Sequence, residues 1–124
     1  MKIDRLIAVA QQLVAPVKGI LAADESGSTI QKRFDSIDVD STEKNRRDYR
    51  ELLFRTRGVS DFISGVILYD ETLRQNAANG TPMVDLLRER GIVPGIKVDR
   101  GTKPLAGAPG ELITEGLDGL RERL

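Results

Sequence analysis

The apolar run over residues 63–69 (ISGVILY) constrains the fold of this chain more than any other feature. The run is rich in β-branched side chains and shows no apolar–polar alternation, which predicts a parallel strand buried on both faces. Two shorter apolar runs predict further strands, at residues 19–23 and 95–98. We place Pro94 outside the third strand, because a proline cannot donate to the ladder of hydrogen bonds between strands.

Segments with helical character separate these strands. Residues 3–14 carry apolar side chains at helical spacing. A short helix is expected over residues 29–36, with Ser28 or Thr29 as its cap, and a longer one over residues 42–56. Another helix is expected to begin at Thr81–Pro82, with the threonine as cap and the proline as its first residue. Strands that alternate with helices predict parallel βαβ units with right-handed crossovers, so the expected fold class is α/β.

The expected burial of the helix over residues 42–56 divides it into two faces. Tyr49, Leu52 and Leu53 are expected to be buried, whereas the face that carries Arg50 and four other charged side chains is expected to be solvated. Residues 101–110 are rich in glycine and proline and predict a loop. Residues 116–124 are expected to form a final helix.

Composition excludes several classes of protein. The chain has 124 residues and a formal net charge of +0, which suggests one domain and gives no reason to expect a nucleic-acid or membrane partner. It contains no Cys and no His, so thiolate chemistry and the commonest general base and metal ligand are excluded. Its sequence shows neither a membrane-spanning run nor a signal-peptide core, so a cytoplasmic location is expected.

Charged residues at the ends of the expected strands mark a candidate site. Asp24 follows the first strand, and Lys97 lies among apolar residues of the third. Because the carboxyl ends of parallel strands meet at one edge, where ligands bind in such folds, the two side chains are expected to face each other or a bound anion. A structural ion pair is the alternative. For the acids Asp70 and Glu71, the alternative to a site is that Asp70 caps a helix beginning at Glu71.

The sequence also resembles a known family over nearly its whole length. The matching motifs are LAADES and IQKRF near the first strand, then EKNRRDYRELLF, ISGVILYDETL, GTPMVDLLRERGIVPGIKVDRG, KPLAG and GLDGL. They resemble the class I, Schiff-base-forming fructose-bisphosphate aldolases. The resemblance implies a (β/α)8 TIM barrel and an aldehyde-lyase of glycolysis. That enzyme reversibly cleaves fructose 1,6-bisphosphate to dihydroxyacetone phosphate and glyceraldehyde 3-phosphate through a lysine imine, without a metal or other cofactor.

The resemblance also implies roles for individual residues. Asp24 and Lys97 are the expected catalytic pair: Asp24 corresponds to an active-site acid of the family, and Lys97 to a residue near the substrate phosphate. Ser26, Arg33 and Arg46 correspond to residues that help bind the phosphorylated sugar. The order here is DES-G-S-T, whereas the family usually has DEST-G-S, so this loop departs from the family pattern.

The length limits how much of such an enzyme the sequence supplies. A complete eight-stranded barrel takes about 250 residues, so residues 1–124 are expected to form a single partial domain with about three strands of an incomplete barrel. The family's Schiff-base lysine lies in a later strand, so this chain alone is expected to be inactive. It is expected to self-associate or to need the rest of the barrel. The alternative is a non-catalytic partial-barrel module that binds sugar phosphate weakly or assembles with a partner.

Overall fold

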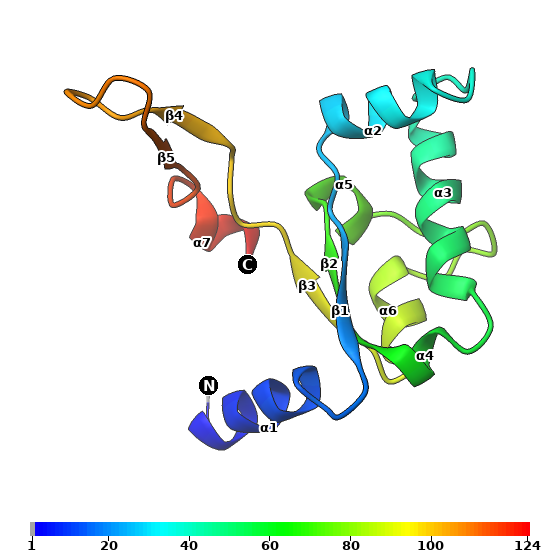
Figure 1. The fold of residues 1–124 in the computed structure, drawn as a ribbon. Coiled ribbons are helices and arrows are strands. Elements are labelled where there is room, and N and C mark those ends of the chain that lie inside the picture. The colour runs from blue at the N-terminus through cyan, green and yellow to red at the C-terminus, as the bar shows by residue number, and fades with distance from the viewer. Residues whose placement is uncertain (1) are drawn as a thin grey trace.

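A computed structural model describes residues 2–124 and confirms the α/β class. Three strands form a parallel sheet in the order β1-β2-β3, and helices connect them (Figure 1). The elements in chain order are α1 (Ile3–Leu13), β1 (Gly19–Ala23), α2 (Gly27–Asp35), α3 (Glu43–Arg55), α4 (Val59–Phe62), β2 (Ile63–Leu68), α5 (Asp70–Leu73), α6 (Met83–Arg88), β3 (Val93–Ile96), β4 (Thr102–Pro104), β5 (Leu112–Thr114) and α7 (Leu120–Arg123).

The register of the sheet brings its three carboxyl ends level. Ala23 at the end of β1 lies opposite Leu68 of β2, and Leu68 lies opposite Ile96 of β3. The residues that follow the strands therefore emerge at one edge. This confirms the expected layout, with Asp24, Asp70 and Lys97 at the carboxyl ends of strands that are adjacent in chain order.

The expected bounds of the third strand were wrong, because Pro94 lies inside it. Pro94 is paired with Val66 of β2. The backbone N–H of Lys97 donates to the carbonyl of Leu68 at 2.8 Å. N–H groups alternate in direction along a strand, so the nitrogen of Pro94 faces away from β2, towards the open side of β3. A proline is tolerated on an edge strand in that orientation.

The core lies between the sheet and the helices on one side of it. Helices α2 to α6 all lie on that side (Figure 1). Phe54 of α3 and Leu68 of β2 are both fully buried there. Burying side chains of this size contributes about 1.5–3 kcal/mol each. The other buried members of this cluster come from the sheet, from α6 and from the segments that flank α6: Ala23, Val66, Ala77, Met83, Leu86, Leu87 and Ile92.

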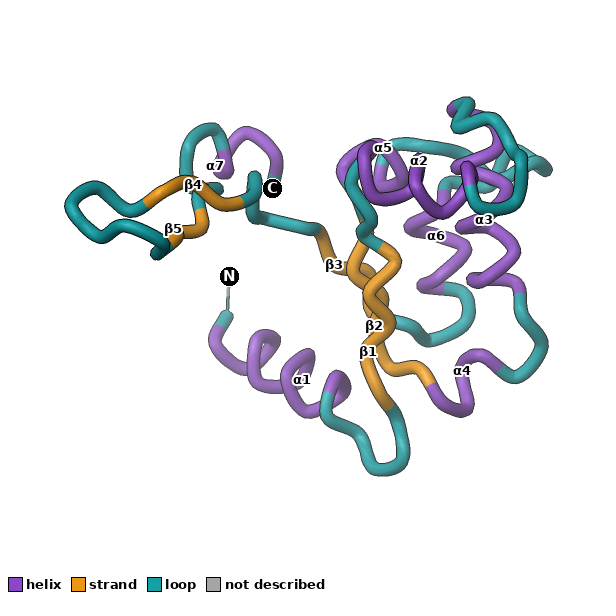
Figure 2. Tube along the Cα trace, turned by 45° about the horizontal axis from the view of Figure 1, so that its top comes forward, coloured by secondary structure: helices purple, strands orange, loops and turns teal. Residues whose placement is uncertain are grey.

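The other side of the sheet is covered much less. Helix α1 and the β4–β5 hairpin lie on that side in both views (Figures 1 and 2). The C-terminal end of α1 is attached to the sheet, because the hydroxyl of Ser64 donates to the carbonyl of Leu13 at 2.7 Å. The Leu13 side chain packs over Gly65, where an added Cβ would lie 2.5 Å from Leu13 Cδ2. The rest of the apolar face of α1 is exposed.

Helix α3 confirms the expected start and corrects the expected burial. Its cap is Thr42, whose hydroxyl accepts from the Asn45 N–H at 3.1 Å. However, Leu52 is 69% exposed, whereas Arg50 is fully buried. The reason is geometric. Arg50 precedes Phe54 by four residues and so lies on the same helix face, and Phe54 points into the core. Leu53 does pack against the core, so the prediction from apolar content was wrong for Leu52 and Arg50 and not for the whole face.

Other boundaries differ from the expectations. Helix α2 begins directly after Ser26, so neither Ser28 nor Thr29 is its cap. Helix α6 follows Pro82 as its N-cap residue, so the threonine before it is not the cap. The expected loop over residues 101–110 instead contains β4, which pairs antiparallel with β5. The final helix is confined to α7.

Within the described range, 2–124, none of the helices is both long enough and apolar enough to span a membrane.

Candidate functional site

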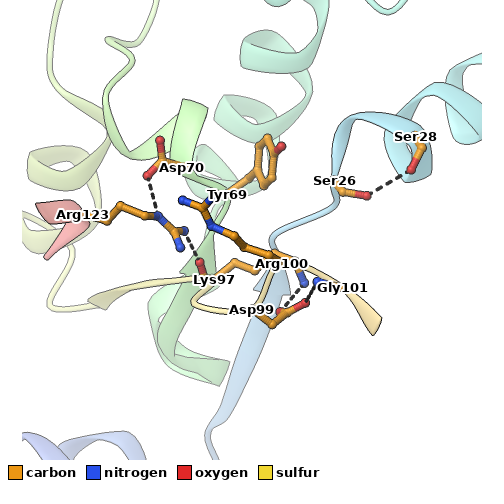
Figure 3. Close-up of a pocket in the computed structure, with 9 residues that line it drawn as sticks. All are labelled: Ser26, Ser28, Tyr69, Asp70, Lys97, Asp99, Arg100, Gly101 and Arg123. Carbon is orange, nitrogen blue, oxygen red and sulfur yellow. Dashed lines mark hydrogen bonds and ion pairs between the residues drawn. The ribbon is translucent and has the colours of Figure 1, made fainter. Parts of the chain in front are cut away.

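A polar cavity of about 760 Å³ lies at the carboxyl edge of the sheet. Its lining comes from the start of α2, the end of β2, the segment after β3 and the C-terminal segment (Figure 3). The lining residues are Ser26, Ser28, Tyr69, Asp70, Lys97, Asp99, Arg100, Gly101 and Arg123. The cavity therefore lies where parallel α/β folds place their ligands.

Lys97 is held between two carboxylates at this edge. Its Nζ lies 2.6 Å from Asp99 Oδ1 and 3.6 Å from Asp24 Oδ2. The hydrogen bond that Lys97 donates to Asp99, assisted by the charge of Asp24, raises the pKa of Lys97 above its ordinary value of 10.5. The side chain is therefore an ammonium at neutral pH. Asp24 and Lys97 do form the ion pair that the sequence suggested, but Asp99 makes the closer contact.

Asp70 and Glu71 diverge, although they are neighbours in the sequence. Asp70 is the first residue of α5 rather than its cap, so the expected capping arrangement is wrong. Asp70 lines the cavity and pairs with Arg74 at 3.3 Å and with Arg123 at 3.6 Å. The hydrogen bond from Arg74, together with Arg123, lowers the pKa of Asp70. Glu71 instead pairs with Arg46, away from the cavity.

The structure brings together only some of the residues to which the resemblance assigns site roles. Asp24, Ser26 and Lys97 lie at the cavity or in contact with its lining. Arg33 does not line it. Its side chain is 56% exposed, and its Nη1 donates to Glu25 Oε1 at 2.6 Å. Arg46 donates from Nε and Nη2 to Glu71 at 2.9 and 2.8 Å, and this hydrogen-bonded pair raises the pKa of Arg46.

Two arginines at the cavity were missed as site residues by sequence reasoning. Arg123 Nη2 donates to the carbonyl of Lys97 at 2.7 Å, and its Nη1 donates to that of Val98 at 3.2 Å (Figure 3). No sequence signal pointed to this contact, because it depends on how the C-terminal segment folds back onto β3. Arg100 lies in the segment that follows β3 at the carboxyl edge, directly after Asp99. That position in the sequence could have marked it as a site residue.

In the part of the chain that the structure describes, no three or more Asp or Glu side chains gather in a way that could hold a metal ion.

The fold and the cavity define an α/β protein with a charged, hydroxyl-bearing site at the carboxyl ends of its parallel strands. A family model described as fructose-bisphosphate aldolase class-I matches residues 5–124. The chain therefore belongs to the class I fructose-bisphosphate aldolase family.

Relatives and a solved structure agree with this assignment. A probable fructose-bisphosphate aldolase class 1 from Xanthomonas campestris pv. campestris is 59% identical over 124 residues, which are 100% of this chain and 37% of that protein. The cytoplasmic isozyme from Spinacia oleracea is 57% identical over 120 residues, covering 97% of this chain and 34% of the relative. The Plasmodium falciparum aldolase, solved in complex with TRAP and a small-molecule inhibitor, superposes with a TM-score of 0.92 at 53% identity.

These proteins are much longer than the sequence described. The match to the Plasmodium falciparum structure covers 97% of this chain and 35% of that one. The three-stranded sheet thus corresponds to the first part of an aldolase barrel.

Proposed function

We propose that these 124 residues supply the first three strands of the active site of a class I fructose-bisphosphate aldolase. Such an enzyme reversibly cleaves fructose 1,6-bisphosphate through a lysine imine. The observation that carries the proposal is the position of Lys97, an ammonium that reaches the polar cavity from the end of β3 with Asp24 beside it. The family match over residues 5–124 supports the same reaction.

The roles that we propose follow from the chemistry of each group. Lys97 binds a phosphate oxygen, because a raised pKa keeps it cationic and a charge-assisted hydrogen bond to an anion is strong. The Ser26 hydroxyl, which lies at the start of α2, donates to the same anion. We assign Asp24 the role of acid or base, because its carboxylate lies 3.6 Å from the Lys97 ammonium and so close to a sugar whose phosphate that ammonium would bind.

Arg33 and Arg46 stay predictions as phosphate-binding residues. Each is already paired with a carboxylate, Glu25 for Arg33 and Glu71 for Arg46. Binding substrate would require each arginine to exchange or share that partner. The half-exposed side chain of Arg33 is better placed to do so than that of Arg46, which is 21% exposed.

We propose further that the 124-residue polypeptide does not form the imine by itself. Imine formation needs a lysine that is deprotonated near neutral pH, and the pKa of Lys97 is shifted in the opposite direction. The relatives, of which this chain covers 34–37%, have ample further sequence for such a lysine. A purely non-catalytic module is not favoured, because the relatives that match this chain over its whole length are named aldolases.

The proposal also covers the location of the protein and its association with other chains. We place the protein in the cytoplasm, because the Spinacia oleracea relative is named a cytoplasmic isozyme and an Arabidopsis thaliana relative is named cytosolic. We expect the 124-residue polypeptide to self-associate or to bind the remainder of a barrel, because β1 and β3 each have one unpaired edge in the described sheet.

The experiment that tests the proposed site is a titration of the 124-residue chain with dihydroxyacetone phosphate, followed by NMR. We expect a dissociation constant in the millimolar range, or about −4 kcal/mol, because the cavity is open. Lys97→Met should weaken binding. Lys103→Met, which removes an exposed lysine of β4 outside the cavity lining, is the matched control. Equal binding by the parent and Lys97→Met would refute the proposed phosphate site.

A further inference from the structure

A buried arginine beneath the candidate site has no role in the family-based assignment. We propose that Arg50 is a positioning residue that fixes the loop carrying Asp24 and Ser26 at the edge of the cavity. A role of Arg50 in catalysis rests on the proposed function. The contacts of Arg50 and the test below do not depend on that function.

The first contact lies between Arg50 and the loop after β1. Arg50 Nη2 donates to the backbone carbonyl of Glu25 at 2.6 Å and lies 3.5 Å from Glu25 Oε2. Glu25 stands between Asp24, which pairs with Lys97, and Ser26, which lines the cavity. A hydrogen bond to this carbonyl restricts the peptide plane between Glu25 and Ser26, so it acts directly on Ser26 and reaches Asp24 through the backbone of Glu25.

The second contact lies between Arg50 and the end of β2. The guanidinium carbon lies 5.7 Å from the centre of the Tyr69 ring, within the range of a cation–π interaction. Tyr69 lines the cavity and directly precedes Asp70. Arg50 thus links the two segments that leave β1 and β2, and it does not itself line the cavity.

Stability alone is a poor explanation for a buried guanidinium here. Burying a charged side chain is costly, and a well-packed apolar residue of similar volume is often as stabilising as a buried ion pair. Glu25 already has a second partner, because Arg33 donates to its Oε1 at 2.6 Å. Among residues 2–124, neither Nε nor Nη1 of Arg50 makes a hydrogen bond. The polar contacts of Arg50 within that range are therefore concentrated on Glu25, and an apolar side chain could not reproduce the one to its carbonyl.

The test is a mutant cycle that measures coupling between Asp24 and Lys97 in the 124-residue chain at neutral pH. The readout is the ¹³C resonance of the Asp24 carboxylate. In the parent chain, Lys97→Met should shift this resonance, because it removes the ammonium at 3.6 Å. In an Arg50→Met background, the same Lys97→Met substitution should leave the resonance almost unmoved, because the loop is no longer held. A general loss of stability would not remove this coupling in a folded protein.

Two additional variants test whether the coupling between Asp24 and Lys97 depends specifically on the guanidinium of Arg50. Arg47→Met removes an arginine of the same helix that pairs with its neighbour Asp48, and it should keep the full coupling. Arg50→Lys keeps the positive charge, but a compact ammonium on a shorter side chain cannot both reach the Glu25 carbonyl and lie over the Tyr69 ring as the planar guanidinium does, so it should show reduced coupling. Arg50→Met is expected to fold, because Glu25 keeps Arg33. If its amide spectrum shows an unfolded chain, Arg50→Lys decides the question.

The outcomes separate this inference from the proposed function. Coupling equal to that of the parent in Arg50→Met, or in Arg50→Lys if the methionine variant does not fold, would overturn the positioning role. An equal loss of coupling in Arg47→Met would overturn it too. Lost coupling in the Arg50 variants, together with no binding of dihydroxyacetone phosphate by the parent, would support the positioning role and refute the proposed phosphate site.

Discussion

Lys97 and Asp24 meet across the end of an intervening strand. Nζ of Lys97 lies 3.6 Å from Oδ2 of Asp24, although β2 lies between β1 and β3 in the sheet. Neighbouring strands are about 4.8 Å apart, so both side chains must converge over the carboxyl end of β2. The contact therefore depends on the parallel register of all three strands. It places an ammonium and a carboxylate together at the carboxyl edge of the sheet.

Asp99 should control the protonation of Lys97 more strongly than Asp24 does. The hydrogen bond between Asp99 and Lys97 is the largest cause of the raised pKa of that lysine. Asp99→Asn should therefore lower the Lys97 pKa towards its ordinary value, and the Lys97 ammonium should move closer to Asp24. A pH titration of the Lys97 side-chain resonances measures this. Asp85→Asn, at an exposed carboxylate of α6 that pairs with Arg88, is the control and should leave the titration unchanged.

Acid should destabilise the folded chain in a defined pH window. The pKa of Asp99 is lowered by Lys97 and then by the N–H of Gly101, and that of Asp70 by Arg74 and then by Arg123. Carboxylates with lowered folded-state pKa values stabilise the protein above the ordinary value of 3.8, and this contribution is lost as the pH falls below it. The urea concentration at the midpoint of unfolding should therefore decrease as the pH is lowered through this range. In Asp70→Asn, the urea midpoint should depend less on pH than in the parent chain. The same pH dependence in both would contradict the role of Asp70.

Phe54 should be the most sensitive apolar position of α3. Its side chain is fully buried in the cluster between the sheet and α6. Phe54→Ala should lower the free energy of unfolding by about 3–5 kcal/mol, because it removes buried surface and leaves a cavity. Leu52→Ala, on the same helix but 69% exposed, should cost far less. Chemical denaturation of the two variants gives the comparison, and similar losses would mean that the face of α3 towards the sheet is assigned wrongly.

The exposed apolar face of α1 should contribute to self-association of the 124-residue polypeptide. Leu6 is 53% exposed and Ile7 is 50% exposed. Ile7→Lys should reduce the apparent mass measured by light scattering, because it places a charge in the apolar face. Ala8→Lys adds the same charge about 100° further round the helix and should have a smaller effect. A monodisperse monomer in the parent chain would contradict this prediction.

Part of the fold and of the site could be predicted because the signals were local. The apolar run of β2 predicted its own strand, and the carboxyl-edge argument placed Asp24 with Lys97. The burial of Arg50 could not be predicted, because its main partner, Glu25, is distant in sequence and comes close only after folding. The β4–β5 hairpin was missed for a similar reason. Its pairing of Thr102 with Thr114 spans a turn rich in glycine and proline that locally predicts only a loop.

We propose that these residues form the first part of a class I aldolase site and that the imine-forming lysine is not among their side chains. The most direct measurement incubates the 124-residue chain with dihydroxyacetone phosphate, reduces the mixture with borohydride and determines the mass of the protein. We expect no adduct. We also expect cleavage of fructose 1,6-bisphosphate to appear when a polypeptide carrying the remaining strands of the Xanthomonas campestris relative is added. A stoichiometric mass gain at one lysine of the chain alone, with Lys97 examined first, would contradict the account.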